Sequence, residues 1–188
     1  EIYTGEDTLS LHDALPISRR RCTTGLSATQ LAAAMGARVI ALDVSEERLA
    51  RAKAFGASDV INPSNTDVVA AIRQLTRGLG AHASLDASSS PEARKQAVQC
   101  VRTWGKACFV GEGGTVSLDV SPDMLRRQVT LIGSWTFSTN GQADCARFIA
   151  DRKIDVDSLF TDRWTLADAE KAYQLFDKQT TGKGVFLM

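Results

Sequence analysis

The chain has 188 residues, and 44% of them are hydrophobic, which is enough to bury one sizeable core. Lysine plus arginine and aspartate plus glutamate number 22 each, so net charge gives no attraction to nucleic acid or to an acidic membrane. No apolar run approaches the ~20 residues of a membrane span, and the first residues lack the order of a signal peptide. We expect neither nucleic acid nor membrane as a partner.

The four cysteines are scattered along the chain and form no CxxC pair: Cys22, Cys100, Cys108 and Cys145. No histidine stands at ligand spacing from any of them. This pattern argues against a zinc site and is typical of buried or idle thiols in a reduced cytoplasm. We therefore expect a cytoplasmic protein.

The first eighteen residues, EIYTGEDTLSLHDALPIS, have no convincing periodicity. They resemble the conceptual translation of a sequencing-library adapter. EIYT can be encoded by GAG ATC TAC ACN, and TLSLHDALPI by ACT CTT TCC CTA CAC GAC GCT CTT CCG ATC. We interpret residues 1–18 as an artefact and residues 19–24 as a junction, with an ordinary N-terminal arm as the alternative. Pro16 also makes this stretch a poor central strand.

The first predicted elements form half of a dinucleotide-binding motif. From Gly25 to Asp43 the chain reads GLSATQLAAAMGARVIALD: a small-residue helix, a glycine stop, a β-branched strand and an acid. In a nucleotide-binding βαβ unit, the helix N-terminus faces the pyrophosphate and the acid accepts the ribose hydroxyls. If Gly25 is the third glycine of GxGxxG, the first two positions hold Arg20 and Cys22. The fingerprint is therefore broken.

Helix and strand signals alternate after Asp43. The predicted elements, in order, are a helix capped by Ser45, a strand over 59–61, a helix with Val68, Ile72 and Leu75 on one face, a strand over 83–86, a helix starting at Ser90-Pro91, and strands over 106–110 and 129–132. This alternation predicts an α/β fold with a doubly wound parallel sheet.

The rhythm changes after Thr136. One helix is marked by Cys145, Phe148 and Ile149, and a second by Ala169, Ala172, Tyr173 and Phe176 at helical spacing. An apolar strand over 184–187 closes the chain. These elements look like a piece of another structural unit.

Everything from Gly25 to Met188 resembles the C-terminal half of medium-chain zinc-type alcohol dehydrogenases, including the polyol and threonine dehydrogenase branch. The matching stretches, in order, are GLSATQLAAAMGARVIALD, SEERLARAKAFGASDVINP, GKACFVGEGG, LIGSW and DAEKAYQLF…TGKGVFLM. The resemblance implies that residues 25–136 are a partial Rossmann NAD-binding domain lacking its first strand. Residues 137–188 would be the C-terminal return segment of a GroES-like catalytic domain.

The resemblance also assigns residues to the cofactor. Asp43 would hold the adenosine ribose and repel a 2′-phosphate by ~1–4 kcal/mol, which favours NAD over NADP. Arg48 would lie near the same ribose, and Gly25 and Leu26 beside the pyrophosphate at the helix N-terminus. Each assignment has a structural alternative. Asp43 could be only an acidic residue at a strand end, Arg48 an exposed helix arginine, and Gly25 a position of close packing between helix and strand.

A second set of residues ends the later strands, where open α/β sheets bind ligands. By resemblance, Ala87 and Ser88 lie along the edge of the cleft, while Ser90 is better interpreted as a helix cap. The backbone around the nicotinamide ring would be supplied by Val110, Gly111, Glu112, Ser134 and Thr136. Ordinary strand-end loops are the alternative for this set.

For the intact parent, the resemblance implies hydride transfer between a secondary alcohol and NAD, with zinc holding the substrate oxygen. The family's zinc ligands and proton relay lie in its first half, so the resemblance implies no catalytic residue and no metal ligand in this chain. We expect it to bind the dinucleotide without turnover of its own. Family members commonly pair through Rossmann sheet edges, so a homo-oligomer is compatible with the resemblance.

Two other functions stay open. A zinc-free quinone reductase of the same superfamily would use NADPH, and Asp43 argues against it. A nucleotide-binding or interaction module without chemistry is the alternative from another class. A methyltransferase is a weaker third, because its glycine loop would belong to a region that this chain does not show.

Overall fold

The structure is a computed structural model and describes residues 14–18, 24–135, 138–178 and 183–188. A six-stranded sheet forms its larger part, in the order β3-β2-β1-β4-β5-β6 with every neighbouring pair parallel. The strands are β1 Ala14–Ser18, β2 Arg38–Leu42, β3 Ala57–Ile61, β4 Ala81–Asp86, β5 Val101–Phe109 and β6 Thr130–Gly133. This is the strand order of a doubly wound Rossmann sheet, which confirms the expected fold class.

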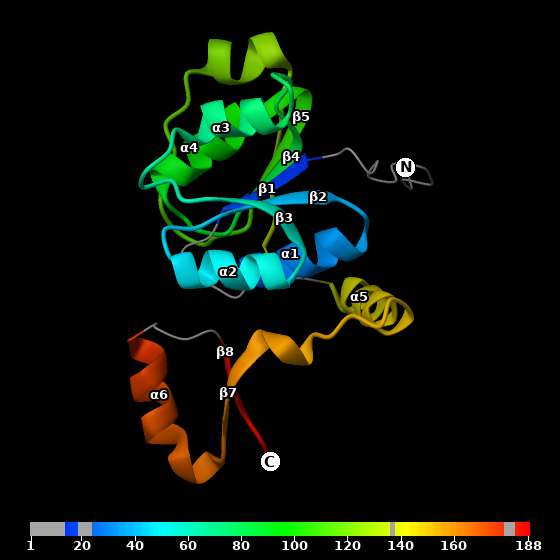
Figure 1. Ribbon diagram of the computed structural model, residues 1–188, viewed down its shortest axis with the longest axis vertical. Helices are drawn as coiled ribbons and strands as arrows, with labels where there is room; N and C mark the ends of the chain where they lie inside the picture. The colour runs from blue at the N-terminus through cyan, green and yellow to red at the C-terminus, as the bar shows by residue number, and fades with distance from the viewer. Residues whose placement is uncertain (1–13, 19–23, 136–137, 179–182) are drawn as a thin grey trace.

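Helices cover both faces of the sheet, α1 and α2 on one and α3 and α4 on the other (Figure 1). Their bounds are α1 Thr24–Ala34, α2 Glu46–Ala54, α3 Val68–Leu75 and α4 Pro91–Cys100. Successive β2 side chains alternate between two apolar clusters, since Val39 packs on the α1 side and Ile40 on the α3 side. The continuous apolar run of β2 is therefore the signature of a strand buried on both faces.

One detail of the expectation is corrected, because the sheet does not lack its first strand. Residues 14–18 lie between β2 and β4, paired with β2 along their whole length and with β4 only at Ile17 and Ser18. A strand at this position gives hydrogen-bond partners to backbone groups of β2 and β4. This gain offsets the one hydrogen bond that is missing because Pro16 has no backbone N–H. The adapter origin of residues 1–18 stays a prediction, and residues 1–13 and 19–23 lie outside the described part.

Local sequence signals account for the helix boundaries. Ser45 caps α2 by accepting a hydrogen bond from the Arg48 backbone N–H, as predicted. Asp67 caps α3 in the same way, with 3.0 Å between its Oδ1 and the Ala70 nitrogen. Gly56 follows α2 at φ +98°, a conformation that glycine adopts without strain.

A C-terminal region follows the sheet and contacts it on the α1 side. Its elements are α5 Thr139–Asp151, β7 Phe160–Trp164, α6 Ala169–Asp177 and β8 Lys183–Phe186, with β7 and β8 forming a parallel pair. Figure 1 shows α6, β7 and β8 beyond α1 and α2, away from the sheet. The contacts between them include Leu159 and Val156, which pack in the α1-side cluster, and a 2.6 Å hydrogen bond from Gln30 Nε2 to the Asp155 carbonyl.

Short irregular helices complete the described structure. The connection from β5 to β6 contains a π-helical turn over Val120–Met124 and a 3-10 turn over Leu125–Arg127. Strand β7 is flanked by 3-10 turns over Asp157–Leu159 and Leu166–Asp168. Across the described ranges, no helix has both the length and the apolar character required to cross a membrane.

Candidate functional site

A cavity of about 180 Å³ lies at the carboxyl ends of the central strands. It is lined by Leu42, Asp43, Val44, Pro63, Ser64, Ser88, Ser90, Glu92, Ala93 and Gln96. We call it the strand-end cavity. The strand order runs outward from β1 in both directions, so the chain reverses its winding between β2 and β4. The cavity lies at this point, which is where doubly wound sheets bind ligands.

Asp43 forms the β2 side of the cavity and is 2% exposed. Its Oδ1 accepts a hydrogen bond from the Ser45 backbone nitrogen at 2.9 Å, and Arg48 Nη1 lies 3.6 Å from the same oxygen. The first turn of α2 therefore orients this carboxylate and supplies a neighbouring positive charge. The structure brings Asp43 and Arg48 together. An oriented carboxylate in a cavity is suited to accept hydrogen bonds from a diol.

The loops after β4 and β5 lie side by side at the same sheet edge. The backbone nitrogens of Val110 and Gly111 both donate to the Asp86 carbonyl, at 2.9 and 3.2 Å. Ala87 is buried beside them, while Ser88 lines the strand-end cavity. Four of the predicted cofactor residues are thus brought together.

The remaining residues predicted for the nicotinamide side are more exposed. Glu112 follows Gly111 with its side chain in solvent. The backbone nitrogen of Ser134 donates to the Phe109 carbonyl at 3.0 Å, so this residue continues the same edge beyond β6. Thr136 lies outside the described residues.

Gly25 and Leu26 lie in the first turn of α1, and both are buried. Leu26 packs in the cluster that α1 shares with β2, so its side chain serves the core. Any contribution of Gly25 and Leu26 to anion binding would come from their backbone N–H groups at the helix N-terminus. The fingerprint positions Arg20 and Cys22 lie outside the described residues.

Sequence reasoning missed two buried charged residues beside this site. Asp86 is fully buried at the end of β4, and Arg94 on α4 is 7% exposed. Arg94 Nε lies 3.5 Å from Asp86 Oδ2, and Arg94 Nη2 donates to the Gly111 carbonyl at 2.6 Å. A signal was present: an arginine four residues after a helix start, on the face shared with Ala97 and Val98, is placed toward the core.

No metal centre is found among the described ranges, where no three His, Cys, Asp or Glu side chains are grouped closely enough to hold an ion. Burial raises the pKa of the Cys100 thiol to about 12 and also raises the pKa of Cys108. Both thiols are therefore protonated at neutral pH. Cys145 is exposed on α5, and Cys22 is not among the described residues.

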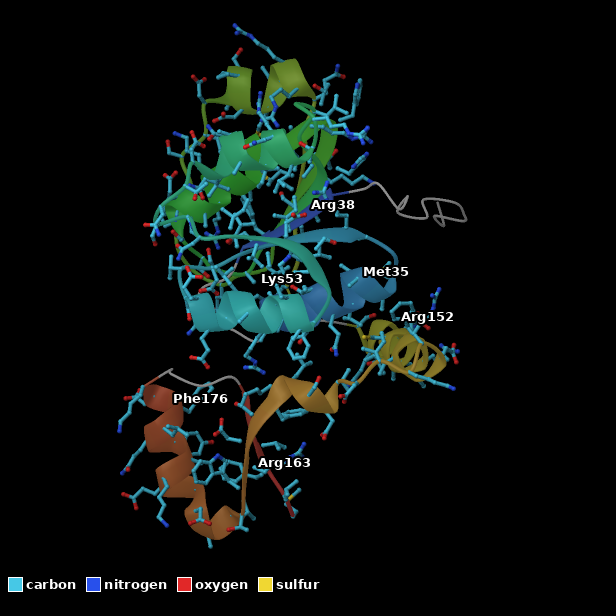
Figure 2. All side chains as sticks on the ribbon, viewed as in Figure 1. Met35, Arg38, Lys53, Arg152, Arg163 and Phe176 are labelled. Carbon is cyan, nitrogen blue, oxygen red and sulfur yellow. The ribbon has the colours of Figure 1, made fainter. Side chains whose placement is uncertain are left out.

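A second cavity of about 190 Å³ lies in the C-terminal region between α6 and the β7–β8 pair. Its lining is mostly apolar and aromatic: Asp162, Trp164, Ala172, Tyr173, Leu175, Phe176, Gly184 and Phe186. Figure 2 places Phe176 and Arg163 in this region, far from Arg38 at the start of β2. This cavity lacks the cluster of polar strand ends that defines the first one.

Comparison with known proteins gives a consistent result. The sequence profile of zinc-binding dehydrogenases matches residues 23–151. The chain is 36% identical over 163 residues to the zinc-type alcohol dehydrogenase-like protein YphC of Escherichia coli (strain K12), an alignment covering 86% of this chain and 46% of that protein. It is 32% identical over 173 residues to L-threonine 3-dehydrogenase of Pyrococcus furiosus, covering 87% of this chain and 48% of that protein.

Solved structures show the same relation. Benzyl alcohol dehydrogenase from Acinetobacter calcoaceticus superposes with a TM-score of 0.83 at 29% identity, covering 96% of this chain and 50% of that chain. The chain thus spans about half the length of the relatives it matches. Because the matched profile extends over most of the sequence, the chain belongs to the zinc-binding dehydrogenase family.

Proposed function

We propose that this chain is the cofactor-binding part of a zinc-dependent, NAD(H)-linked alcohol or polyol dehydrogenase. The observation that carries the proposal is the buried carboxylate of Asp43 at the edge of the strand-end cavity, beside Arg48. In the intact parent, the nicotinamide ring exchanges a hydride with a secondary alcohol. Residues 25–136 form the NAD-binding domain in this proposal, and residues 137–188 return to the catalytic domain.

The residues present fit the adenosine half of NAD. The Asp43 carboxylate accepts hydrogen bonds from the two ribose hydroxyls, and Val44, Pro63 and Ala93 offer apolar surface to the base. A 2′-phosphate would bring a second negative charge against a carboxylate that is 2% exposed, where screening is weak. The donor set therefore favours NAD over NADP.

The residues around the other strand ends fit the remaining half. The N-terminal turn of α1, with Gly25 and Leu26, offers backbone N–H groups to the pyrophosphate. Beyond it, the backbone of Val110, Gly111, Glu112 and Ser134, together with Thr136, would hold the nicotinamide and its carboxamide. These groups bind and orient the ring without taking part in proton transfer.

Zinc and the proton relay belong to the other half of the parent in this proposal, so the chain alone has no alcohol turnover. The apolar cavity around Trp164, Tyr173 and Phe176 fits a face that packs against that other half. The exposed edge strand β6, with Leu131 and Ile132 each 39% exposed, fits pairing of two copies. The cytoplasm is the proposed location, because the thiols at Cys100 and Cys108 are free.

Isothermal titration of the 188-residue chain with NADH, NADPH and AMP tests the proposal. Replacing Asp43 with Ala should raise the dissociation constants of NADH and AMP by at least about tenfold, since two charge-assisted hydrogen bonds are lost. The preference for NADH over NADPH should shrink at the same time. Asp144→Ala on α5, an exposed aspartate, is the matched control and should bind as the wild type does.

Other outcomes point to other functions. Tighter binding of NADPH than of NADH by the wild-type chain would favour the zinc-free quinone reductase. Binding of AMP with no gain from the nicotinamide half would favour a nucleotide-binding module without redox chemistry. Absence of binding by all three ligands, with the chain folded, overturns the proposal.

A further inference from the structure

A buried ion pair joins the end of β4 to α4. Asp86 is fully buried, Arg94 is 7% exposed, and Nε of the arginine lies 3.5 Å from Oδ2 of the aspartate. Removing two charges from water is costly, and such pairs are weak evidence for stability in themselves. The geometry around the pair indicates what it positions.

The aspartate holds the loop after β4. Its Oδ1 accepts hydrogen bonds from the backbone nitrogen of Ser88 at 3.1 Å and from the Ser88 hydroxyl at 2.5 Å. Its Oδ2 accepts a third from the backbone nitrogen of Ser89 at 3.2 Å. Ser89 has φ +62°, a left-handed conformation that costs free energy for a residue with a Cβ. The carboxylate therefore maintains this loop in a conformation that it would not otherwise keep.

The arginine holds the loop after β5. Its Nη2 donates to the Gly111 carbonyl at 2.6 Å, and its guanidinium carbon lies 5.5 Å from the centre of the Phe109 ring. The nitrogens of Val110 and Gly111 donate in turn to the Asp86 carbonyl. Both ends of the ion pair thus bind the same loop, one through a side chain and one through the backbone.

The two loops are also in direct contact, with no room for a side chain at Gly111 or Gly114. A Cβ atom on Gly111 would lie 2.7 Å from both the nitrogen and the hydroxyl oxygen of Ser89, closer than real contacts allow. A Cβ on Gly114 would collide with the Ser89 carbonyl oxygen. A shift of either loop therefore displaces the other.

We propose that Asp86 and Arg94 are a positioning pair that fixes the loops after β4 and β5 as one unit for the dinucleotide. The inference rests on the proposed function, and goes beyond it by assigning a role to two residues that do not line the strand-end cavity. Ser88 carries the effect of the pair to the strand-end cavity, and Gly111 carries it to the nicotinamide side. Arg94 acts mainly on the nicotinamide half, because its hydrogen bond ends on Gly111, whereas Ser88 on the adenosine half is held by Asp86 Oδ1 rather than by Arg94.

Arg94→Lys tests this assignment, because it keeps the positive charge and loses the fork that reaches both partners. We expect the dissociation constant of NADH to rise about tenfold, while that of AMP stays within about twofold. Arg126→Lys, at an exposed arginine, is the matched control and should change neither value. An equal rise in the dissociation constants of AMP and NADH, or no change in either constant, overturns the inference.

Amide hydrogen exchange on the unliganded chain tests the pair without any cofactor. In Arg94→Lys, the amides of Ser89, Val110 and Gly111 should exchange at least about tenfold faster, with those of Ser45 and Ala70 unchanged. Failure of the wild-type chain to bind any nucleotide would remove the proposed function, while the exchange result would still decide whether the pair holds the loops. Unchanged exchange at the three amides overturns the positioning role.

A double variant guards against loss of the fold. Asp86→Asn with Arg94→Met removes both charges, so neither is left buried alone. It should raise the dissociation constant of NADH more than Arg94→Lys does and should raise that of AMP as well, because the carboxylate that holds Ser88 and Ser89 is lost. If Arg94→Lys and the double variant both unfold, the pair supports the whole sheet and the local role is overturned.

Discussion

The sheet and the C-terminal region differ in how they bury their apolar side chains. In the sheet, Val39, Ile40, Ile72 and Val98 are fully buried between strands and helices. In the C-terminal region the larger side chains remain open, since Tyr173 is 67% exposed and Phe176 is 60% exposed. Only Leu159 and Ala172 are buried among the hydrophobic residues described there.

The comparison separates a region with its own core from one whose apolar face lacks a cover. A sheet with helices on both faces satisfies the layer rule by itself. A parallel pair of strands with one helix does not, and its aromatic residues line an open cavity of about 190 Å³. We therefore expect the two regions to respond differently to mutation.

The strongest way to break the comparison is to delete residues 1–18. The sheet then loses β1 from between β2 and β4, and we expect no cooperative unfolding, because the loss is comparable with the ~5–15 kcal/mol of a whole domain. Circular dichroism during urea titration measures this. A chain beginning at Asp13 keeps the strand and is the control. Equal urea midpoints for both chains would show that β1 contributes nothing.

A smaller effect is expected for Ile72→Ala in α3. Its side chain is fully buried in the cluster on the α3 side, so truncation should cost about 2–5 kcal/mol of unfolding free energy. Leu166→Ala in the C-terminal region is the contrast, since Leu166 is 63% exposed and should cost less than about 0.5 kcal/mol. Similar losses for the two variants would remove the distinction between the regions.

Leu159→Ala sharpens the comparison at the join. Leu159 is 8% exposed and packs in the α1-side cluster, so its truncation should cost about 2–3 kcal/mol and release the C-terminal region from the sheet. Limited proteolysis should then cut near residues 152–158 faster than in the wild type. Leu187→Ala, at a 54% exposed site, should leave the cutting rate unchanged.

The smallest predicted effect appears only at alkaline pH. The folded chain keeps the Cys100 thiol protonated up to a pKa of about 12, whereas the unfolded thiol titrates near 9. Between these values the unfolded state binds fewer protons, so the unfolding free energy should fall by up to about 1.4 kcal/mol per pH unit. Cys100→Ala should remove that fall, measured by urea titration at pH 8 and pH 10. Cys145→Ala on exposed α5 should retain it.

Much of the sheet was predictable from local signals. The β-branched strand predicted before Asp43 is found as β2, and Ser45 caps α2 as predicted. Ser90 stands at the N-cap position of α4, but its side chain makes no capping hydrogen bond. These predictions succeed because helix capping and strand burial both depend on residues that are adjacent in the sequence. The strand β7 was missed because its residues, FTDRW, alternate between polar and apolar in a half-exposed pair and show no continuous apolar run.

The candidate site was predictable where it depends on a strand end and hidden where it depends on distant partners. Asp43 follows a β-branched strand, so its position at the sheet edge could be predicted. The role of β1 could not, because the slot between β2 and β4 is a property of the whole sheet rather than of residues 14–18. The burial of Arg94 was indicated by its helix face, but the roles of Asp86 and Arg94 could not be predicted, since their partner Gly111 lies 17 residues beyond the arginine.

The packing of Leu159 determines where this protein can be cut for study. A chain that stops at Trp135 would remove Leu159 from the α1-side cluster, expose part of that cluster to water and promote aggregation. A chain that continues through Leu159 would keep that side chain packed in the cluster and would omit the uncovered aromatic face. Crystallisation of the nucleotide site alone is best attempted with that longer boundary.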